Sequence, residues 1–108
     1  MRSEAALGVL LLELHFPANR SLKEKRGPLT SLRDVVQQRF RAAFSEVAHQ
    51  DAWQLAGVLI VIAASSLSQA EQRLADVERY VHGRDEFEVS RTVVRSVDDV
   101  ASIWDHEG

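Results

Sequence analysis

Four residues of this 108-residue chain carry side chains that could bind a small ligand or take part in a reaction. Two carboxylates held close together in a pocket can work as general acid and base, and an imidazole nearby can help to bind an anion. The residues of this candidate pocket are His15, Glu46, Asp51 and Trp53. The alternative interpretation is structural: Glu46 is a solvated charge, Asp51 belongs to a turn, and Trp53 plugs one end of the fold.

Basic residues cluster in one segment of a chain whose formal net charge is −3. Between Arg20 and Arg41 there are seven basic and two acidic residues, a net +5, whereas the remainder has six basic and fourteen acidic residues, a net −8. This asymmetry favours an oriented interaction with an anionic partner, although Lys/Arg-rich helix surfaces are also commonly just solvated. Free N–H groups where a helix starts, near Ser21, would also face an anion. The residues that we assign to anion or RNA binding are Arg20, Lys23, Lys25, Arg26 and Arg33.

The remaining motifs give no support for a metal site or a familiar catalytic arrangement. The four histidines show none of the HxH, HxxxH or HExxH spacings that hold metals, and the chain has no cysteine. We expect His15 and His49 to lie at opposite ends of the protein. No serine lies in a GxSxG sequence, and no glycine-rich phosphate loop is present. We therefore predict no catalytic residue, no metal and no cofactor; a non-enzymatic protein is favoured, and enzymatic activity is left open.

Four segments predict β-strands. Residues 6–14 and 55–64 are apolar on both faces, as strands are when other strands flank them on both sides. Residues 42–49 and 87–96 alternate apolar with polar side chains, which is typical of outer strands.

Two amphipathic helices are predicted between these strands. Ser21 with Glu24 fits a capping box at the start of the first helix, and Ser68 with Glu71 fits a second. A Gly-Pro pair ends at Pro28, so we expect a short first turn to stop there and the main helix to start at Pro28. The apolar stripes at helical spacing are Leu29, Leu32, Val36 and Phe40 in the first helix and Ala70, Leu74, Val77 and Val81 in the second.

This order of elements, βαββαβ, predicts an α/β protein of the ferredoxin-like class. Such an α+β sandwich has an antiparallel sheet ordered 4-1-3-2 with both helices on one face. The two segments with unbroken apolar runs are the two that this topology places at the centre of the sheet. We expect a single domain over residues 1–97 and a C-terminal tail over residues 98–108.

One face of the sheet is left open in such a sandwich, and aliphatic side chains of residues 6–14 would line it. We expect a second subunit to cover this face in a homodimer, or the tail to cover it with Ile103 and Trp104. The face lacks the aromatic residues on which RNA-recognition domains stack bases. No apolar run approaches the roughly 20 residues that span a bilayer, and no signal peptide is recognisable, so we predict a cytoplasmic protein without membrane contact.

Two runs of the sequence form a recognisable pattern after Gly8-Val9: His15-x-Pro17-x-x-x-Ser21-Leu22-Lys23-Glu24-Lys25-Arg26, and Glu46-Val47 followed by Gln50-Asp51-x-Trp53-Gln54. Together they resemble a small bacterial family, the YlxP-like proteins. The resemblance extends over about residues 6–96, and the two runs together are more specific than either alone. It implies a ferredoxin-like fold and no established activity. Genes of this family often lie among those for translation initiation and ribosome maturation, which is an association and not a mechanism.

Together these observations predict a small, non-enzymatic protein that docks on an anionic partner through its basic segment. Ribosomal RNA, within the ribosome, is the leading candidate for this partner. Two alternatives remain open: a protein–protein adaptor that uses the sheet face, and a small-ligand or enzymatic site in the candidate pocket.

Overall fold

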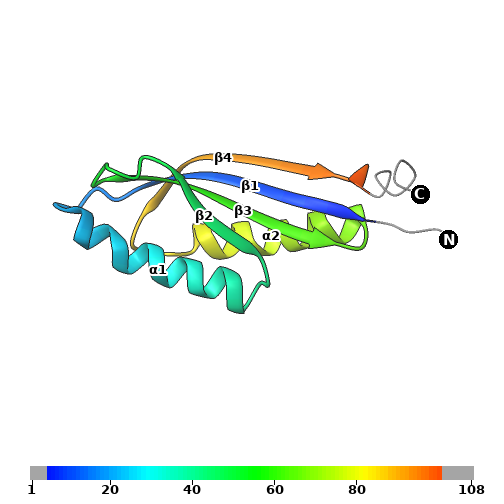
Figure 1. Cartoon of the computed structure of the whole chain (residues 1–108). Helices are drawn as coiled ribbons and strands as arrows, with labels where there is room; N and C mark the ends of the chain where they lie inside the picture. Colours follow the sequence, from blue (N-terminus) through cyan, green and yellow to red (C-terminus); the bar gives the residue numbers. More distant parts are fainter. Residues whose placement is uncertain (1–4, 101–108) are drawn as a thin grey trace.

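The structure, a computed structural model, describes residues 5–100 of the chain. Its elements follow one another in the predicted βαββαβ order (Figure 1). They are β1 (Ala6–His15), α1 (Leu22–Gln38), β2 (Ala43–Ala48), β3 (Leu55–Ala64), α2 (Leu67–His82) and β4 (Glu88–Val97). The predicted boundaries of the four strands are confirmed to within a residue or two.

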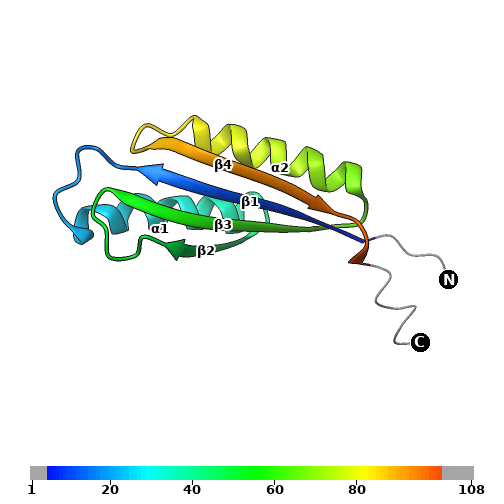
Figure 2. The same cartoon turned by 90° about the horizontal axis from the view of Figure 1, so that it is seen from above.

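The four strands form one antiparallel sheet in the order β2-β3-β1-β4. This order is the predicted 4-1-3-2 counted from the opposite edge, and the two apolar strands β1 and β3 are central as expected. Both helices lie on the same face of the sheet (Figure 1), with α1 near β2 and β3 and α2 near β1 and β4 (Figure 2). The arrangement has the ferredoxin-like topology.

The core lies between the sheet and the two helices. Alternate residues of the central strands point into it, since successive side chains of a strand face opposite sides. The fully buried strand residues include Leu10, Leu12, Leu14, Val58, Ile60 and Ile62, and the buried helix residues include Leu29, Leu32, Val36, Leu74, Val77 and Val81. Contact between β1 and α2 is close at Gly8, where an added Cβ would lie 2.7 Å from Leu74 Cγ.

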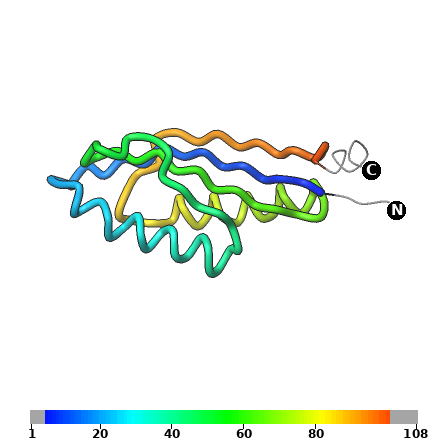
Figure 3. The backbone as a smooth tube through the Cα atoms, in the orientation of Figure 1, coloured from blue at the N-terminus to red at the C-terminus, as the bar shows by residue number. Residues whose placement is uncertain are grey.

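Helix α1 corrects one prediction, because it runs without interruption from Leu22 through Pro28 to Gln38 (Figure 3). Proline removes one backbone donor from a helix, but the residues on both sides of Pro28 are anchored. Ser21 caps the first turn by accepting a hydrogen bond from Glu24 N at 3.2 Å. Leu29 continues the buried face beyond the proline. Packing on both sides of Pro28 therefore outweighs the loss of one hydrogen bond.

Helix α2 starts two residues earlier than predicted. Its N-cap is Ser66, whose Oγ accepts a hydrogen bond from Gln69 N at 3.1 Å. The Gln69 side chain in turn accepts from Ser65 N at 2.9 Å. A glutamine at the third position thus completes the capping arrangement, and Ser68 lies inside the first turn.

The open face of the sheet is aliphatic, as predicted. Of the large residues on it, Leu11 is 40% exposed and Val97 is 37% exposed. The segment predicted to form a tail lies, beyond residue 100, outside the described residues, as do Ile103 and Trp104. Within residues 5–100 neither helix is long and apolar enough to cross a membrane.

Candidate functional site

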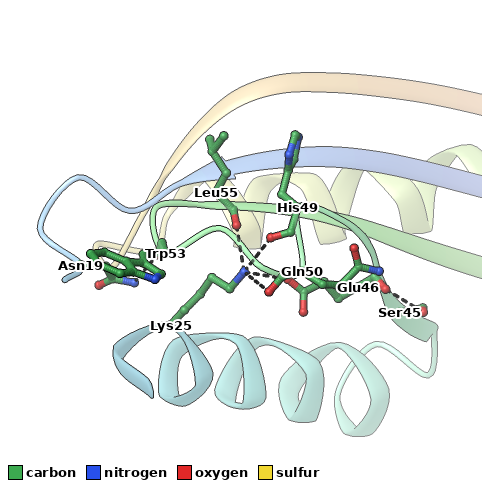
Figure 4. A network of polar contacts seen from close by, with 8 residues as sticks. All are labelled: Asn19, Lys25, Ser45, Glu46, His49, Gln50, Trp53 and Leu55. Carbon is green, nitrogen blue, oxygen red and sulfur yellow. Dashed lines mark hydrogen bonds and ion pairs between the residues drawn. The ribbon is translucent and has the colours of Figure 1, made fainter. Parts of the chain in front are cut away.

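Lys25 is the centre of a polar network beneath the loop that joins β2 to β3 (Figure 4). The residue is only 3% exposed. Its ammonium donates to three backbone carbonyls, of His49 at 3.0 Å, Gln50 at 3.3 Å and Leu55 at 3.0 Å. It also lies 3.0 Å from Glu46 Oε2, a buried carboxylate oxygen that has no aligned hydrogen bond of its own. The three N–H donors of the ammonium are therefore fully engaged within the protein.

Lys25 is therefore not available to bind an external anion, and its assignment to the anion-binding residues was wrong. Its side chain points inward because α1 is continuous, so Lys25 shares the buried face with Leu29 and Leu32, four and seven residues further on. Glu46 does not line the predicted pocket, because its carboxylate pairs with Lys25. The helical spacing back from Leu29 was the signal that could have placed Lys25 on the buried face.

Two loops lie against each other at this end of the sheet: residues 16–21, between β1 and α1, and residues 49–54, between β2 and β3. We call them the paired loops. Each of the two sequence runs that carry the family resemblance contributes one of these loops. The hydrogen bonds that join them are Phe16 N to Gln54 O (2.8 Å), Gln54 Nε2 to Pro17 O (3.3 Å) and to Asn19 O (3.2 Å), and Asn19 Nδ2 to Trp53 O (3.3 Å).

The remaining members of the predicted pocket come together. His15, Asp51 and Trp53 line a shallow, open hollow of about 490 Å³ beside the paired loops. The Trp53 side chain does not plug the end of the sandwich, because the residue is 54% exposed. His15 Nδ1 lies 3.6 Å from the carboxylate of Glu88. Two aromatic rings and the carboxylate of Asp51 therefore line the hollow, while the carboxylate of Glu88 lies beside His15 at its edge.

The other predicted cations lie on the surface of the segment that starts α1. Arg20, Lys23 and Arg26 are exposed and form no ion pair with any described residue. Arg33 is also exposed, but its guanidinium lies 3.1 Å from the Asp34 carboxylate. Arg26 and Arg33 lie seven residues apart, about two helical turns, and so share one side of α1. Both line a groove of about 240 Å³ between α1 and β2.

The structure corrects the predicted separation of His15 and His49. Strands β1 and β2 both pair antiparallel with β3, so they run in the same direction and end at the same side of the sheet. His49 Nε2 lies 3.1 Å from the Glu13 carboxylate. The Ser90 hydroxyl donates to the same carboxylate at 3.1 Å. Sequence reasoning missed this cluster.

This cluster is not a serine–histidine catalytic pair, because the Ser90 hydroxyl bonds to Glu13 and not to the imidazole. The hydrogen bond from Ser90, followed by that from His49, holds the pKa of the Glu13 carboxyl below its ordinary value. No three metal-ligating side chains come together within residues 5–100.

The fold and the site thus define a small ferredoxin-like sandwich. It has a buried lysine, Lys25, that binds the β2–β3 loop, and three exposed cations, Arg20, Lys23 and Arg26, at the start of α1, which we call the basic turn. Residues 7–95 match the family described as "Protein of unknown function (DUF503)", and the chain belongs to that family. It is 38% identical over 77 residues to the "Uncharacterized protein YlxP" of Bacillus subtilis (strain 168). The aligned residues cover 70% of this chain and 80% of that protein. The resemblance to the YlxP-like family is confirmed.

A search of solved structures finds 30S ribosomal protein S6 from Thermotoga maritima. The alignment covers 98% of this chain and 96% of that one, at 9% sequence identity and a TM-score of 0.44.

Proposed function

We propose that the protein docks on RNA, and among RNAs on ribosomal RNA, through the exposed cations at the start of α1. One observation carries the proposal: Arg20, Lys23 and Arg26 are exposed and unpaired among the described residues, on a chain whose formal net charge is −3. Side-chain cations on an otherwise acidic body orient it toward phosphate oxygens, which repeat along every nucleic acid. The association of the family's genes with ribosome maturation is the reason for favouring ribosomal RNA.

The backbone N–H groups at the start of α1 contribute less to the proposed phosphate binding than the sequence predicts. Glu24 reaches back and accepts a hydrogen bond from Arg20 N at 2.6 Å. A carboxylate of the protein therefore already lies where a bound phosphate would meet the helix N-terminus. The proposed RNA contacts accordingly come from the side chains of Arg20, Lys23 and Arg26, with Arg33 as a weaker contributor because Asp34 pairs with it.

The experiment is an affinity measurement with a labelled ribosomal RNA fragment at about 50 and 200 mM salt, a range over which phosphate contacts weaken steeply. The test variant carries Arg20→Gln, Lys23→Gln and Arg26→Gln. We expect weaker binding at low salt and a slope of log K against log salt that is shallower by about 2 to 3.

The matched control carries Arg79→Gln, Arg91→Gln and Arg95→Gln, which removes the same charge from exposed positions on α2 and β4. We expect the control to retain the wild-type slope. If the two triple variants bind RNA equally well, general charge and not the basic turn determines binding, and the proposal is wrong. Co-sedimentation of the wild type with ribosomal subunits then identifies the RNA in its natural context.

A second candidate function is association of two copies through the open sheet face. The observation that favours it is the exposure of Leu11 and Val97 on a face that also carries both signs of charge, Glu13 and Arg95. A two-fold axis brings such a surface against itself. Sedimentation velocity at micromolar concentration tests the prediction, and a stable monomer contradicts it.

A further inference from the structure

Trp53 is exposed in a way that the core does not explain. The residue is 54% exposed, whereas a tryptophan that serves the fold buries most of its large ring. The paired loops also do not need its side chain, since it is the backbone oxygen of Trp53 that accepts the hydrogen bond from Asn19. The indole is therefore available to a partner.

The loop that carries Trp53 is held firmly from two sides. From below, the buried ammonium of Lys25 binds the carbonyls of His49, Gln50 and Leu55, which flank the loop (Figure 4). From the side, Asn19 donates to the carbonyl of Trp53 itself. An exposed ring on an immobilised backbone is preorganised for binding, because little conformational freedom remains to be lost.

The surroundings of the ring fit a nucleobase. His15 and Asp51 line the same hollow of about 490 Å³. The Asp51 carboxylate disfavours a phosphate inside the hollow, but it can accept hydrogen bonds from the amino group of a base. Arg20 directly follows Asn19, whose side chain contacts the Trp53 backbone. This exposed cation is therefore next in sequence to a contact that joins the paired loops, and Arg20 can meet a phosphate that flanks a base on the exposed Trp53.

We propose that Trp53 stacks on an unpaired base of a single-stranded RNA segment, with the base in the hollow and the adjoining phosphates on Arg20 and Lys23. This inference rests on the proposed function and names its ligand more closely. Single strands bind proteins through a basic surface beside aromatic side chains, since every base has a face on which a ring can stack. Base-paired RNA keeps these faces within the helix and is not the ligand.

The experiment uses the intrinsic fluorescence of Trp53. The chain has two tryptophans, so the full chain with Trp104→Phe retains Trp53 as the single reporter. The probes are an unstructured oligoribonucleotide of mixed sequence and the same strand annealed to its complement. We expect quenching by the single strand at low salt and much less quenching by the duplex at equal phosphate concentration.

Affinity measurements with the same single strand provide the second readout. We expect Trp53→Ala to weaken binding about tenfold or more, in the range found when one stacked base is lost, and Trp53→Phe to retain most of the affinity. The control is Val47→Ala, which shortens another exposed apolar residue on the neighbouring strand β2. It should leave the affinity unchanged. Circular dichroism confirms that each variant is folded.

The outcomes separate this inference from the proposed function. If RNA binding depends on Arg20, Lys23 and Arg26 but neither quenches Trp53 nor responds to Trp53→Ala, docking stands and the stacking inference is overturned. Equal quenching by duplex and single strand also overturns it. If the wild-type protein binds no RNA at low salt, both proposals fail.

Discussion

The ammonium of Lys25 lies 3.0 Å from the carboxylate of Glu46, and this ion pair joins α1 to the edge strand β2. The lysine is almost wholly buried, whereas the side chain of Glu46 is 27% exposed. Because the same ammonium also binds three carbonyls of the β2–β3 connection, Lys25 holds the loop that presents Trp53 from the side of α1.

Replacing Lys25 with methionine should destabilise the protein markedly. Lys25→Met keeps the apolar stem but leaves the buried oxygen of Glu46 without its cation and takes the ammonium from three carbonyls, of which that of His49 keeps its hydrogen bond from Ala52 N. We expect a loss of about 3 kcal/mol in the free energy of unfolding, as found when one partner of a buried ion pair is removed. Urea unfolding followed by circular dichroism measures it. Lys23→Met, on the exposed side of the helix, is the control and should change stability by less than about 0.5 kcal/mol.

Two glycines should respond differently to replacement by alanine. A Cβ on Gly8 would lie 2.7 Å from Leu74, which is buried and has little room to move, so we expect Gly8→Ala to cost about 1–3 kcal/mol. A Cβ on Gly27 meets nothing within 4 Å beyond its two chain neighbours and the backbone of its own helix, which favours Gly27→Ala by up to about 0.5–1 kcal/mol. The ring of Pro28, which directly follows, crowds the Cβ of a preceding helical residue and reduces this gain. Thermal unfolding of both variants tests the pair. A loss of stability in Gly27→Ala would indicate that crowding between the new Cβ and the ring of Pro28 outweighs the gain.

The Glu13 carboxyl should make stability depend on pH in the acid range. Its pKa in the folded protein is lowered from 4.5, first by the Ser90 hydrogen bond and then by His49. A lowered folded pKa means that the contribution is present above the pKa of the unfolded chain and is lost as pH falls through the folded value. Glu13→Gln should therefore flatten the fall of stability below about pH 4.5.

An NMR titration of the Glu13 carboxyl gives a direct measurement of the same effect. In Ser90→Ala the pKa should rise toward its ordinary value, because the largest contribution to the shift has been removed. An unchanged titration curve in this variant would assign the shift to His49 instead.

The contact between the paired loops should depend on Gln54. Gln54→Ala removes the donors to Pro17 O and Asn19 O, and we expect a loss of about 1 kcal/mol. Amide hydrogen exchange should become faster in both loops while the core strands keep their protection. Gln50→Ala is the matched control, since Gln50 contributes to the network through its backbone oxygen. Equal exchange in the two variants would contradict the role given to the Gln54 side chain.

Much of the fold could be predicted because its signals are local. The unbroken apolar run at residues 55–64 identified the central strand β3, and Ser21 with Glu24 identified the start of α1. The site was harder, because its contacts join residues far apart in the sequence. Lys25 looks like a surface cation until α1 is known to continue through Pro28, which aligns it with the buried face.

The predicted separation of His15 and His49 was wrong for a different reason. Both lie at the ends of strands, and placing them required following the direction of each strand through the sheet. Since β3 separates β1 from β2 and opposes both, the two ends coincide. The Glu13 cluster depended on that geometry and on the irregular pairing of β4 opposite Glu13, which no local pattern in the sequence indicates.

The irregular pairing of the two outer strands limits how copies of this protein can meet. The register of β2 against β3 shifts between Glu46 and Ala48, and Glu46 directs its charge inward toward Lys25. On the other edge, the register of β4 shifts opposite Glu13. Bulges and inward charges make an edge strand a poor template for a further strand. We therefore expect the two edges to resist the addition of further strands, which would otherwise extend the sheet sideways into larger aggregates.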